Sequence, residues 1–218
     1  MLTENIIENY HQIRSQIPTG IELIAVSKNH PAEAIQEIYR QGQRVFGENK
    51  VQELVEKASK LPPDIQWHLI GHLQSNKVKL IAPFVDTIQS VDSENILEKI
   101  DTEAIKNHRK INVLLQIKIA KEDSKTGLTF EEADKIVDLF LAKNYPNVEL
   151  IGLMGMATFT ENKTQIKEEF DSLKSFYDTL SAKLPLRTLS MGMSDDFLLA
   201  IESGANSVRI GSSIFGSR

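Results

Sequence analysis

Two basic residues of this sequence stand where short apolar runs end. Lys28 follows the run IELIAVS, and Arg209 lies within the run NSVRIG, two residues before Gly211. An amine that is partly withdrawn from water is shifted toward its neutral form and can attack a carbonyl group to form a Schiff base. Lys28 is therefore a candidate Schiff-base lysine. A solvated loop lysine is the alternative that the spacing alone leaves open.

A candidate anion site follows the run that contains Arg209. Backbone N–H groups of a Gly/Ser turn such as Gly211-Ser212 can hold a phosphate group, and Ser194, at the expected start of a helix, can add its hydroxyl. Both features also have ordinary structural interpretations. The turn can simply end a strand, and Ser194 can be an N-cap in front of two aspartates that favour the helix dipole.

Other polar residues after the apolar runs are less informative. Asn49 is either a polar group at the rim of a site or the N-cap of a helix. We interpret His68 and His72 in WHLIGH as packing and hydrogen-bonding residues, because no further groups with metal-ligand spacing accompany them, and we expect no metal. The chain has no cysteine, which excludes disulfides, Cys-ligated zinc, iron–sulfur clusters and thiol nucleophiles.

The elements that would position these residues alternate regularly along the chain. Eight apolar, β-branched runs predict strands at residues 21–27, 44–48, 66–71, 86–91, 112–119, 149–154, 187–191 and 206–211. Segments of 3.6-residue period separate them, with start signals at Pro31, at the capping-box pair Thr129 and Glu132, and at Ser194. This alternation predicts a parallel (β/α)8 barrel, whose functional residues lie at the carboxyl ends of the strands. An open doubly wound sheet would normally show a glycine-rich turn after the first strand, where this chain has none.

The composition is that of a soluble globular protein. Hydrophobic residues make up 41% of the 218 residues, charged residues make up 25%, and the net charge of −5 gives no general reason to expect nucleic acid or an anionic membrane as a partner. No segment reaches the roughly 20 apolar residues of a membrane span, and the amino terminus lacks a signal-peptide pattern. We therefore expect a single domain over residues 1–218, located in the cytoplasm.

Six segments of the chain form a recognisable set. They are AVSKNHP, FGENKVQE, WHLIGHLQSNK, QSVDS, GLMGMA and SMGMSDDFLLAIESGANSVRIGSSIFGSR. In these segments the chain resembles the YggS/PROSC family of pyridoxal 5′-phosphate (PLP)-binding homeostasis proteins, from about residue 26 to residue 218. That family is similar to the N-terminal barrel domain of alanine racemases. The resemblance therefore implies a fold type III PLP-binding barrel.

The resemblance also implies a cofactor site. Its residues are Lys28, Asn49, Ser190, Ser194, Arg209, Gly211 and Ser212. By this resemblance Lys28 carries the PLP aldimine and Arg209 faces the pyridine nitrogen. The hydroxyl of Ser194 and the amides of Gly211 and Ser212 hold the phosphate group. Asn49 lies near the lysine.

The chain departs from the usual residues of the family at several positions. They are His30, Lys50, Gln89 and Lys118, and Gln89 stands where the family often has histidine. We expect these departures to affect contacts at the rim of the barrel and not the cofactor site.

The resemblance implies a protein that buffers or delivers PLP and so influences amino-acid and keto-acid balance. We predict a monomer that contacts PLP-dependent apoenzymes transiently and has no robust catalytic activity. Racemases of this class use a tyrosine from another domain as second base, whereas all four tyrosines here fall in expected helices or at the approach to a strand. Two alternatives stay open. One is a small PLP enzyme, such as an amino-acid racemase with His68 or Lys77 as base, and the other is a Schiff-base aldolase barrel without PLP.

Overall fold

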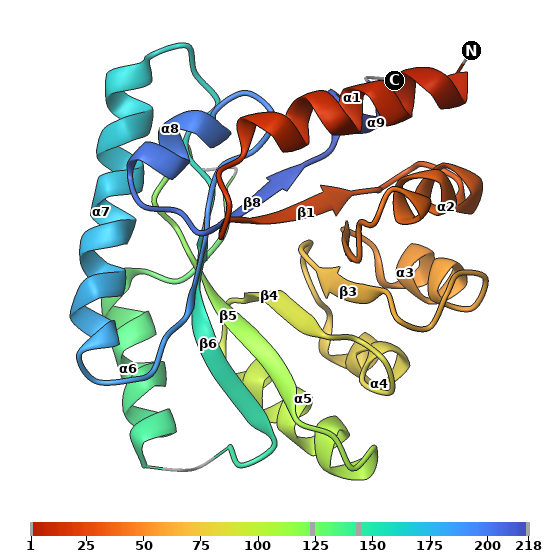
Figure 1. The fold of residues 1–218 in the computed structure, drawn as a ribbon. Coiled ribbons are helices and arrows are strands. Elements are labelled where there is room, and N and C mark those ends of the chain that lie inside the picture. Colours follow the sequence, from red (N-terminus) through yellow and green to blue (C-terminus); the bar gives the residue numbers. More distant parts are fainter. Residues whose placement is uncertain (1, 123–124, 143–144, 217–218) are drawn as a thin grey trace.

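The strands of the protein close into a parallel barrel in a computed structural model that describes residues 2–122, 125–142 and 145–216 (Figure 1). Each strand pairs in parallel with its neighbour in sequence, and β8 pairs with β1 to complete the ring. The strands are β1 (Glu22–Val26), β2 (Val45–Glu48), β3 (Gln66–Leu69), β4 (Thr87–Val91), β5 (Ile111–Ile117), β6 (Val148–Gly155), β7 (Thr188–Ser190) and β8 (Ser207–Ile210). The predicted (β/α)8 barrel is confirmed, and the open doubly wound sheet is excluded.

The strands present two buried faces because successive side chains point to opposite sides. Leu23 and Ala25 of β1 pack in the large apolar cluster between the strands and the helices. The inner side of the barrel is partly polar, and it includes His68, Gln89 and Arg209, all of which are buried. Buried polar side chains must find hydrogen-bond partners, so the side chains on this inner side are held in specific positions by hydrogen bonds.

Helices cover the outside of the barrel (Figure 1). Their stripes of apolar residues, such as Ile35 and Ile38 in α2, are buried against the strands. The helices are α1 (Leu2–Gln16), α2 (Ala32–Arg40), α3 (Val51–Ala58), α4 (Val78–Ile81), α5 (Glu94–Lys106), α6 (Phe130–Leu141), α7 (Lys163–Ser181), α8 (Phe197–Glu202) and α9 (Ser212–Phe215), with a 3₁₀ turn η1 (Ser75–Lys77) before α4.

The predicted helix starts are partly confirmed. Thr129 forms the expected capping box with Glu132 at the start of α6. Pro31 is the N-cap of α2 and not its first helical residue. Ser194 as N-cap of α8 is wrong, because the chain first makes a turn in which the Met193 amide donates to Asp196 Oδ1 at 2.6 Å, and Asp196 becomes the N-cap. The hydroxyl of Ser194 is thereby released for other contacts.

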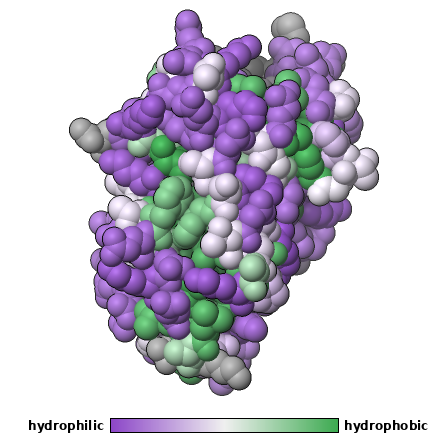
Figure 2. All heavy atoms as spheres, turned by 90° about the vertical axis from the view of Figure 1, so that its left-hand side faces the viewer, coloured by the Kyte–Doolittle hydropathy of each residue, from purple (hydrophilic) through white to green (hydrophobic). Residues whose placement is uncertain are grey.

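The first and last helices, α1 and α9, lie side by side (Figure 1). The Asn9 side-chain amide of α1 donates to the Ile214 carbonyl of α9 at 3.3 Å. The face formed over α6 and α7 is mostly hydrophilic with separate hydrophobic areas (Figure 2). Among the helices of the described ranges, none has both the length and the apolar character needed to cross a membrane.

Candidate functional site

The candidate site lies at the carboxyl ends of four strands that are consecutive neighbours around the barrel. The pairings run β7 to β8, β8 to β1 and β1 to β2. Lys28 follows β1, while Gly211 and Ser212 follow β8, and all three line one pocket of about 180 Å³. The closure of the barrel thus brings the beginning and the end of the chain together at one mouth, as the sequence predicted.

Lys28 itself is exposed, but the backbone on both sides of it is held firmly. Lys57 of α3 donates to the Ser27 carbonyl at 2.7 Å, and the Ser27 hydroxyl donates to Glu48 Oε1 at 2.6 Å. On the other side, the Asn29 amide donates to Glu53 Oε1 at 2.5 Å. Asn29 has a φ of 63°, a left-handed conformation that asparagine tolerates better than most residues. These contacts fix the direction from which the Lys28 side chain leaves the chain.

Two of the three charges that make this clamp, Lys57 and Glu48, are themselves buried. Lys57 Nζ lies 2.7 Å from Glu48 Oε1 and also 2.7 Å from Glu53 Oε1. Glu48 is fully buried, and its Oε2 atom has no hydrogen-bond partner in the described part of the chain. Burial raises the pKa of the Glu48 carboxyl, while the hydrogen bonds from Lys57 and Ser27 oppose that shift. The pair is therefore sensitive to the loss of either member.

The predicted anion-binding residues lie together beside the pocket. The Ser212 hydroxyl donates to Ser194 Oγ at 3.0 Å, and the Ser213 amide lies 3.4 Å from the same oxygen. A Cβ atom at Gly211 would lie only 3.0 Å from the Val26 carbonyl oxygen, so glycine lets this turn pass close to the end of β1. Hydroxyls and amides gathered in this way are suitable donors for a phosphate group.

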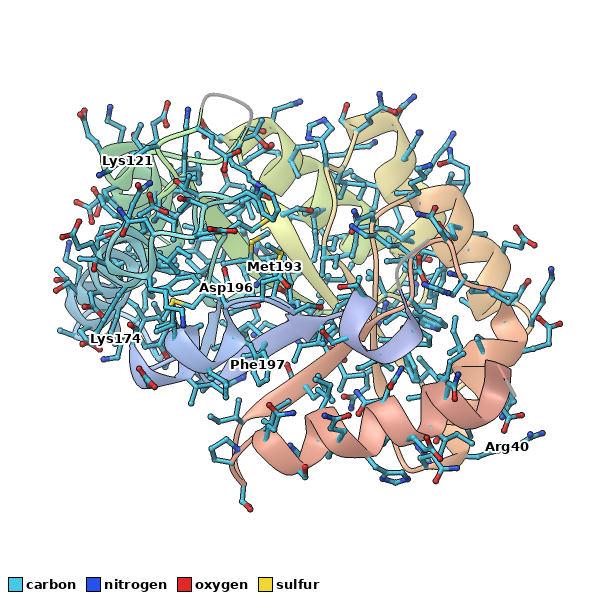
Figure 3. The ribbon with its side chains drawn as sticks, turned by 90° about the horizontal axis from the view of Figure 1, so that it is seen from above. Arg40, Lys121, Lys174, Met193, Asp196 and Phe197 are labelled. Carbon is cyan, nitrogen blue, oxygen red and sulfur yellow. The ribbon has the colours of Figure 1, made fainter. Side chains whose placement is uncertain are left out.

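Arg209 forms the floor beneath these groups and points into the barrel. Its Nη1 donates to Ser190 Oγ at 2.6 Å, and its Nη2 donates to the Gly155 carbonyl at 2.9 Å. Burial lowers the pKa of the guanidinium to about 10, while the charge of Asp196 opposes this shift. Arg209 thus stays charged near neutral pH and acts as a donor only. Asp196, whose charge acts on Arg209, lies toward the interior of the view from above in Figure 3, as does Met193, whereas Arg40 lies at the periphery.

Two further predicted residues occupy different environments from Lys28. Asn49 is half-buried after β2 and does not line the Lys28 pocket. The interpretation of Asn49 as a helix N-cap is wrong, because Lys50 is the N-cap of α3. Ser190 is fully buried, accepts from Arg209 and donates to Gln89 Oε1 at 2.8 Å. Ser190 therefore contacts Arg209 directly, and its place at the pocket itself stays a prediction.

Gln89 shows where the sequence interpretation was wrong. We expected this departure from the family pattern to concern the rim, but the structure buries Gln89 completely inside the barrel. Its amide nitrogen lies 2.9 Å from His68 Nδ1, and His68 Nε2 faces Asp86 Oδ1 at 3.5 Å. The only sequence signal was a polar residue at the centre of the apolar run TIQSV.

Lys57 and Glu48 were also missed. In the sequence, Lys57 continues the three-residue spacing of Val51 and Leu54, which are the buried positions of α3. A charged residue on a buried stripe signals a buried partner, but the sequence does not say which one.

The other candidate bases, His68 and Lys77, do not line the Lys28 pocket, whereas His30 does. His68 lines a separate cavity of about 330 Å³ at the amino ends of the strands. His72 is exposed and faces Asp92 at 3.4 Å, while Lys77 Nζ lies 3.5 Å from Gln52 Oε1. None of the four tyrosines lines the Lys28 pocket. The described residues contain no group of three or more His, Asp or Glu side chains that could hold a metal ion.

The donor set has a definite chemical character. It offers a primary amine at Lys28, a cluster of hydroxyls and amides after β7 and β8, and a buried charged donor at Arg209. These three groups suit a small aromatic ligand that carries a carbonyl carbon, a phosphate group and a ring nitrogen that accepts a hydrogen bond. The residues present therefore fit PLP.

Comparison with known proteins gives the same indication. The family model described as the alanine racemase N-terminal domain matches residues 3–218. The chain is 39% identical to the pyridoxal phosphate homeostasis protein of Vibrio alginolyticus over 231 residues, covering 98% of each chain.

Two solved structures are similar to the chain to different degrees. PipY of Synechococcus elongatus PCC7942, determined with PLP bound, is 38% identical, with a TM-score of 0.87 over 97% of this chain and 100% of PipY. Alanine racemase of Clostridium difficile 630 is only 15% identical, with a TM-score of 0.79 over 99% of this chain and 57% of the racemase. The likeness to the racemase concerns the fold alone.

Proposed function

The chain belongs to the alanine racemase N-terminal domain family and, within it, groups with the pyridoxal phosphate homeostasis proteins, and from this premise we propose that it binds PLP at the mouth of its barrel and serves PLP homeostasis. The relative from Vibrio alginolyticus has that name, and PipY has been determined with PLP bound. We propose further that the protein buffers PLP or delivers it to PLP-dependent apoenzymes.

One observation carries this proposal. Three different donor groups that together match PLP stand on adjacent strands, at the same end of the barrel. Lys28 follows β1, Arg209 lies in β8, and Ser194 and Ser212 follow β7 and β8. Lys28 is more than 160 residues away in sequence from Ser194, Arg209 and Ser212. These groups come together because the barrel closes.

Each part of the cofactor has a residue suited to it. We assign the aldehyde carbon to the Lys28 amine, the phosphate group to Ser194, Ser212 and the Gly211 amide, and the ring nitrogen to Arg209. When bound, PLP supplies a carbonyl that reacts with amines and an aromatic ring that withdraws electrons from the attached atoms. The clamp around Ser27 and Asn29 holds the lysine backbone, and Arg209 donates from a fixed position.

The arrangement supports binding more strongly than catalysis. Arg209 keeps its proton and only donates, so it favours an unprotonated ring nitrogen, and a ring in that form withdraws electrons less strongly. Turnover of an amino acid at the α-carbon also needs a base opposite Lys28, and the tyrosines of this chain line other regions. We therefore propose a protein without robust catalytic activity. From the family resemblance we also propose that it is a monomer, and we propose that it works in the cytoplasm.

Hydrogen exchange separates a carrier from an enzyme. The protein loaded with PLP should exchange the α-hydrogen of alanine and other amino acids in deuterated water no faster than free PLP does. In the same preparation, the protein should restore activity to a PLP-dependent apoenzyme, and Lys28→Ala should abolish this delivery. Rapid exchange across several amino acids that disappears in Lys28→Ala would show an enzyme and reject the carrier function.

A further inference from the structure

A line of buried polar side chains crosses the interior of the barrel from Arg209 to the opposite end. Arg209 of β8 contacts Ser190 of β7, Ser190 contacts Gln89 of β4, and Gln89 contacts His68 of β3. Strands β4 and β7 are not neighbours in the barrel, so the Ser190–Gln89 bond spans its interior. Helices and loops of the mouth take no part in this line.

The hydrogen bonds in this line all run in one direction. Arg209 can only donate, so Ser190 Oγ accepts from it at 2.6 Å and uses its own proton toward Gln89 Oε1 at 2.8 Å. With its oxygen committed, Gln89 presents its NH₂ group to His68 Nδ1 at 2.9 Å. His68 Nδ1 must then be unprotonated, which leaves the ring proton on Nε2, facing Asp86 at 3.5 Å.

Burial makes this direction costly to change. Ser190 and Gln89 are 0% exposed, and Arg209 and His68 are 4% and 5% exposed. Reversing the Ser190–Gln89 bond or the Gln89–His68 bond alone would leave an unsatisfied donor or acceptor on a buried side chain, so these two bonds can only reverse together. The far end stabilises the same direction, because the hydrogen bond from His68 holds the pKa of the Asp86 carboxyl below its usual value.

We propose that His68 and Gln89 are positioning residues for Arg209, acting through Ser190 to fix the plane and the hydrogen-bonding direction of its guanidinium. Because the Ser190 proton points to Gln89, the Arg209–Ser190 pair can present only an N–H of Arg209 toward a ring nitrogen at the mouth. The proposal rests on the proposed PLP site for its functional consequence. The chain of hydrogen bonds itself is a property of the protein without PLP.

The direction of these hydrogen bonds is tested in the protein without PLP. Long-range ¹⁵N–¹H NMR of the histidine side chains at pH 8, with His68 assigned through its bonds to Cβ, should show a protonated Nε2 and an unprotonated Nδ1. A proton on Nδ1 in the wild-type protein would overturn the proposal. This measurement needs no variant and no cofactor.

The coupling to Arg209 is tested with matched variants. Gln89→Met keeps the side-chain length but breaks the line of hydrogen bonds, so ¹⁵N NMR should show faster rotation of the Arg209 guanidinium. The dissociation constant for PLP should rise roughly tenfold, which is the effect of losing about one hydrogen bond. Gln89→Glu still accepts from Ser190 and should restore both readouts toward the wild-type values.

The control replaces a buried glutamine that is not part of this line of hydrogen bonds. Gln43 is 7% exposed and donates to the Leu23 and Val45 carbonyls. Gln43→Met should lower stability without changing the Arg209 signals or the affinity for PLP. Unchanged Arg209 dynamics in Gln89→Met, or the same change in Gln43→Met, would overturn the proposal. If wild-type protein shows the predicted tautomer yet fails to bind PLP, the proposed function is wrong, whereas the inferred line of hydrogen bonds is still supported.

Discussion

Lys28 is exposed, yet its placement depends on a lysine that is buried. Lys57 bridges Glu48, Glu53 and the Ser27 carbonyl, and so joins α3 to the turn after β1. A buried ion pair adds little net stability over an apolar pair of the same shape, but the removal of one partner leaves an uncompensated charge. We infer that the clamp is present for geometry, since it fixes the backbone on both sides of Lys28.

Substitution of Lys57 should reveal this dependence. Lys57→Met leaves Glu48 buried without its cation and should lower the free energy of unfolding by about 3 kcal/mol, measured by urea denaturation. The matched control is Lys60→Met, whose partner Glu56 is exposed and whose loss should leave the free energy of unfolding nearly unchanged.

The double variant adds a second test. Lys57→Met combined with Glu48→Gln removes the unpaired charge and should recover part of the lost stability. Equal losses in Lys57→Met and Lys60→Met would contradict the role of the clamp.

Single residues were predictable from the sequence where their position relative to one strand was enough. Lys28 and Arg209 are identified by the apolar runs beside them, and the structure places both toward the mouth end of the barrel. Glu48, Lys57 and Gln89 were not identified, because their roles come from partners on other elements. The assignment of the predicted residues to PLP stays a prediction.

At the scale of elements, strands were predicted more accurately than helix starts. All eight predicted runs overlap the observed strands, since a fully buried strand needs a continuous apolar run. The capping box of Thr129 is a local interaction and was therefore predictable. Ser194 was misassigned because the turn before α8 is set by the Asp196 carboxylate, and the Ser194 hydroxyl instead faces the start of α9.

The pairing of β6 with β7 depends on a glycine. A Cβ atom at Gly152 would lie 1.7 Å from the Thr188 carbonyl oxygen, which belongs to the backbone of the next strand and cannot move aside. Gly152→Ala should therefore destabilise the protein by about 4 kcal/mol or more, a cost typical only of severe core defects.

Gly155 in the same strand provides the comparison. Its Cβ would meet the ends of the Leu173 and Ile119 side chains, which can shift. Gly155→Ala should cost about 1–2 kcal/mol. Thermal and urea unfolding measure both variants, and a smaller loss for Gly152→Ala than for Gly155→Ala would contradict the packing described here.

At the scale of the whole molecule, barrel closure is what creates the site. Strand β8 pairs with β1, so residues from both ends of the sequence meet at one mouth, and the same interior carries the hydrogen-bond chain toward the opposite cavity. The alternation of strands and helices predicted this closure. The sequence did not predict which polar residues would meet across the interior, because the strand pattern gives a side chain's face but not its partner.

The central claim is that PLP is held covalently at Lys28, and chemical trapping tests it most directly. The Lys28 amine condenses with the PLP aldehyde with loss of water, and borohydride then reduces the C=N bond so that the link survives digestion. Peptide mass spectrometry should find the pyridoxyl group on Lys28 in wild-type protein and in the control Lys50→Ala, and should find none in Lys28→Ala. A label on another lysine, or an undiminished label in Lys28→Ala, would contradict the account.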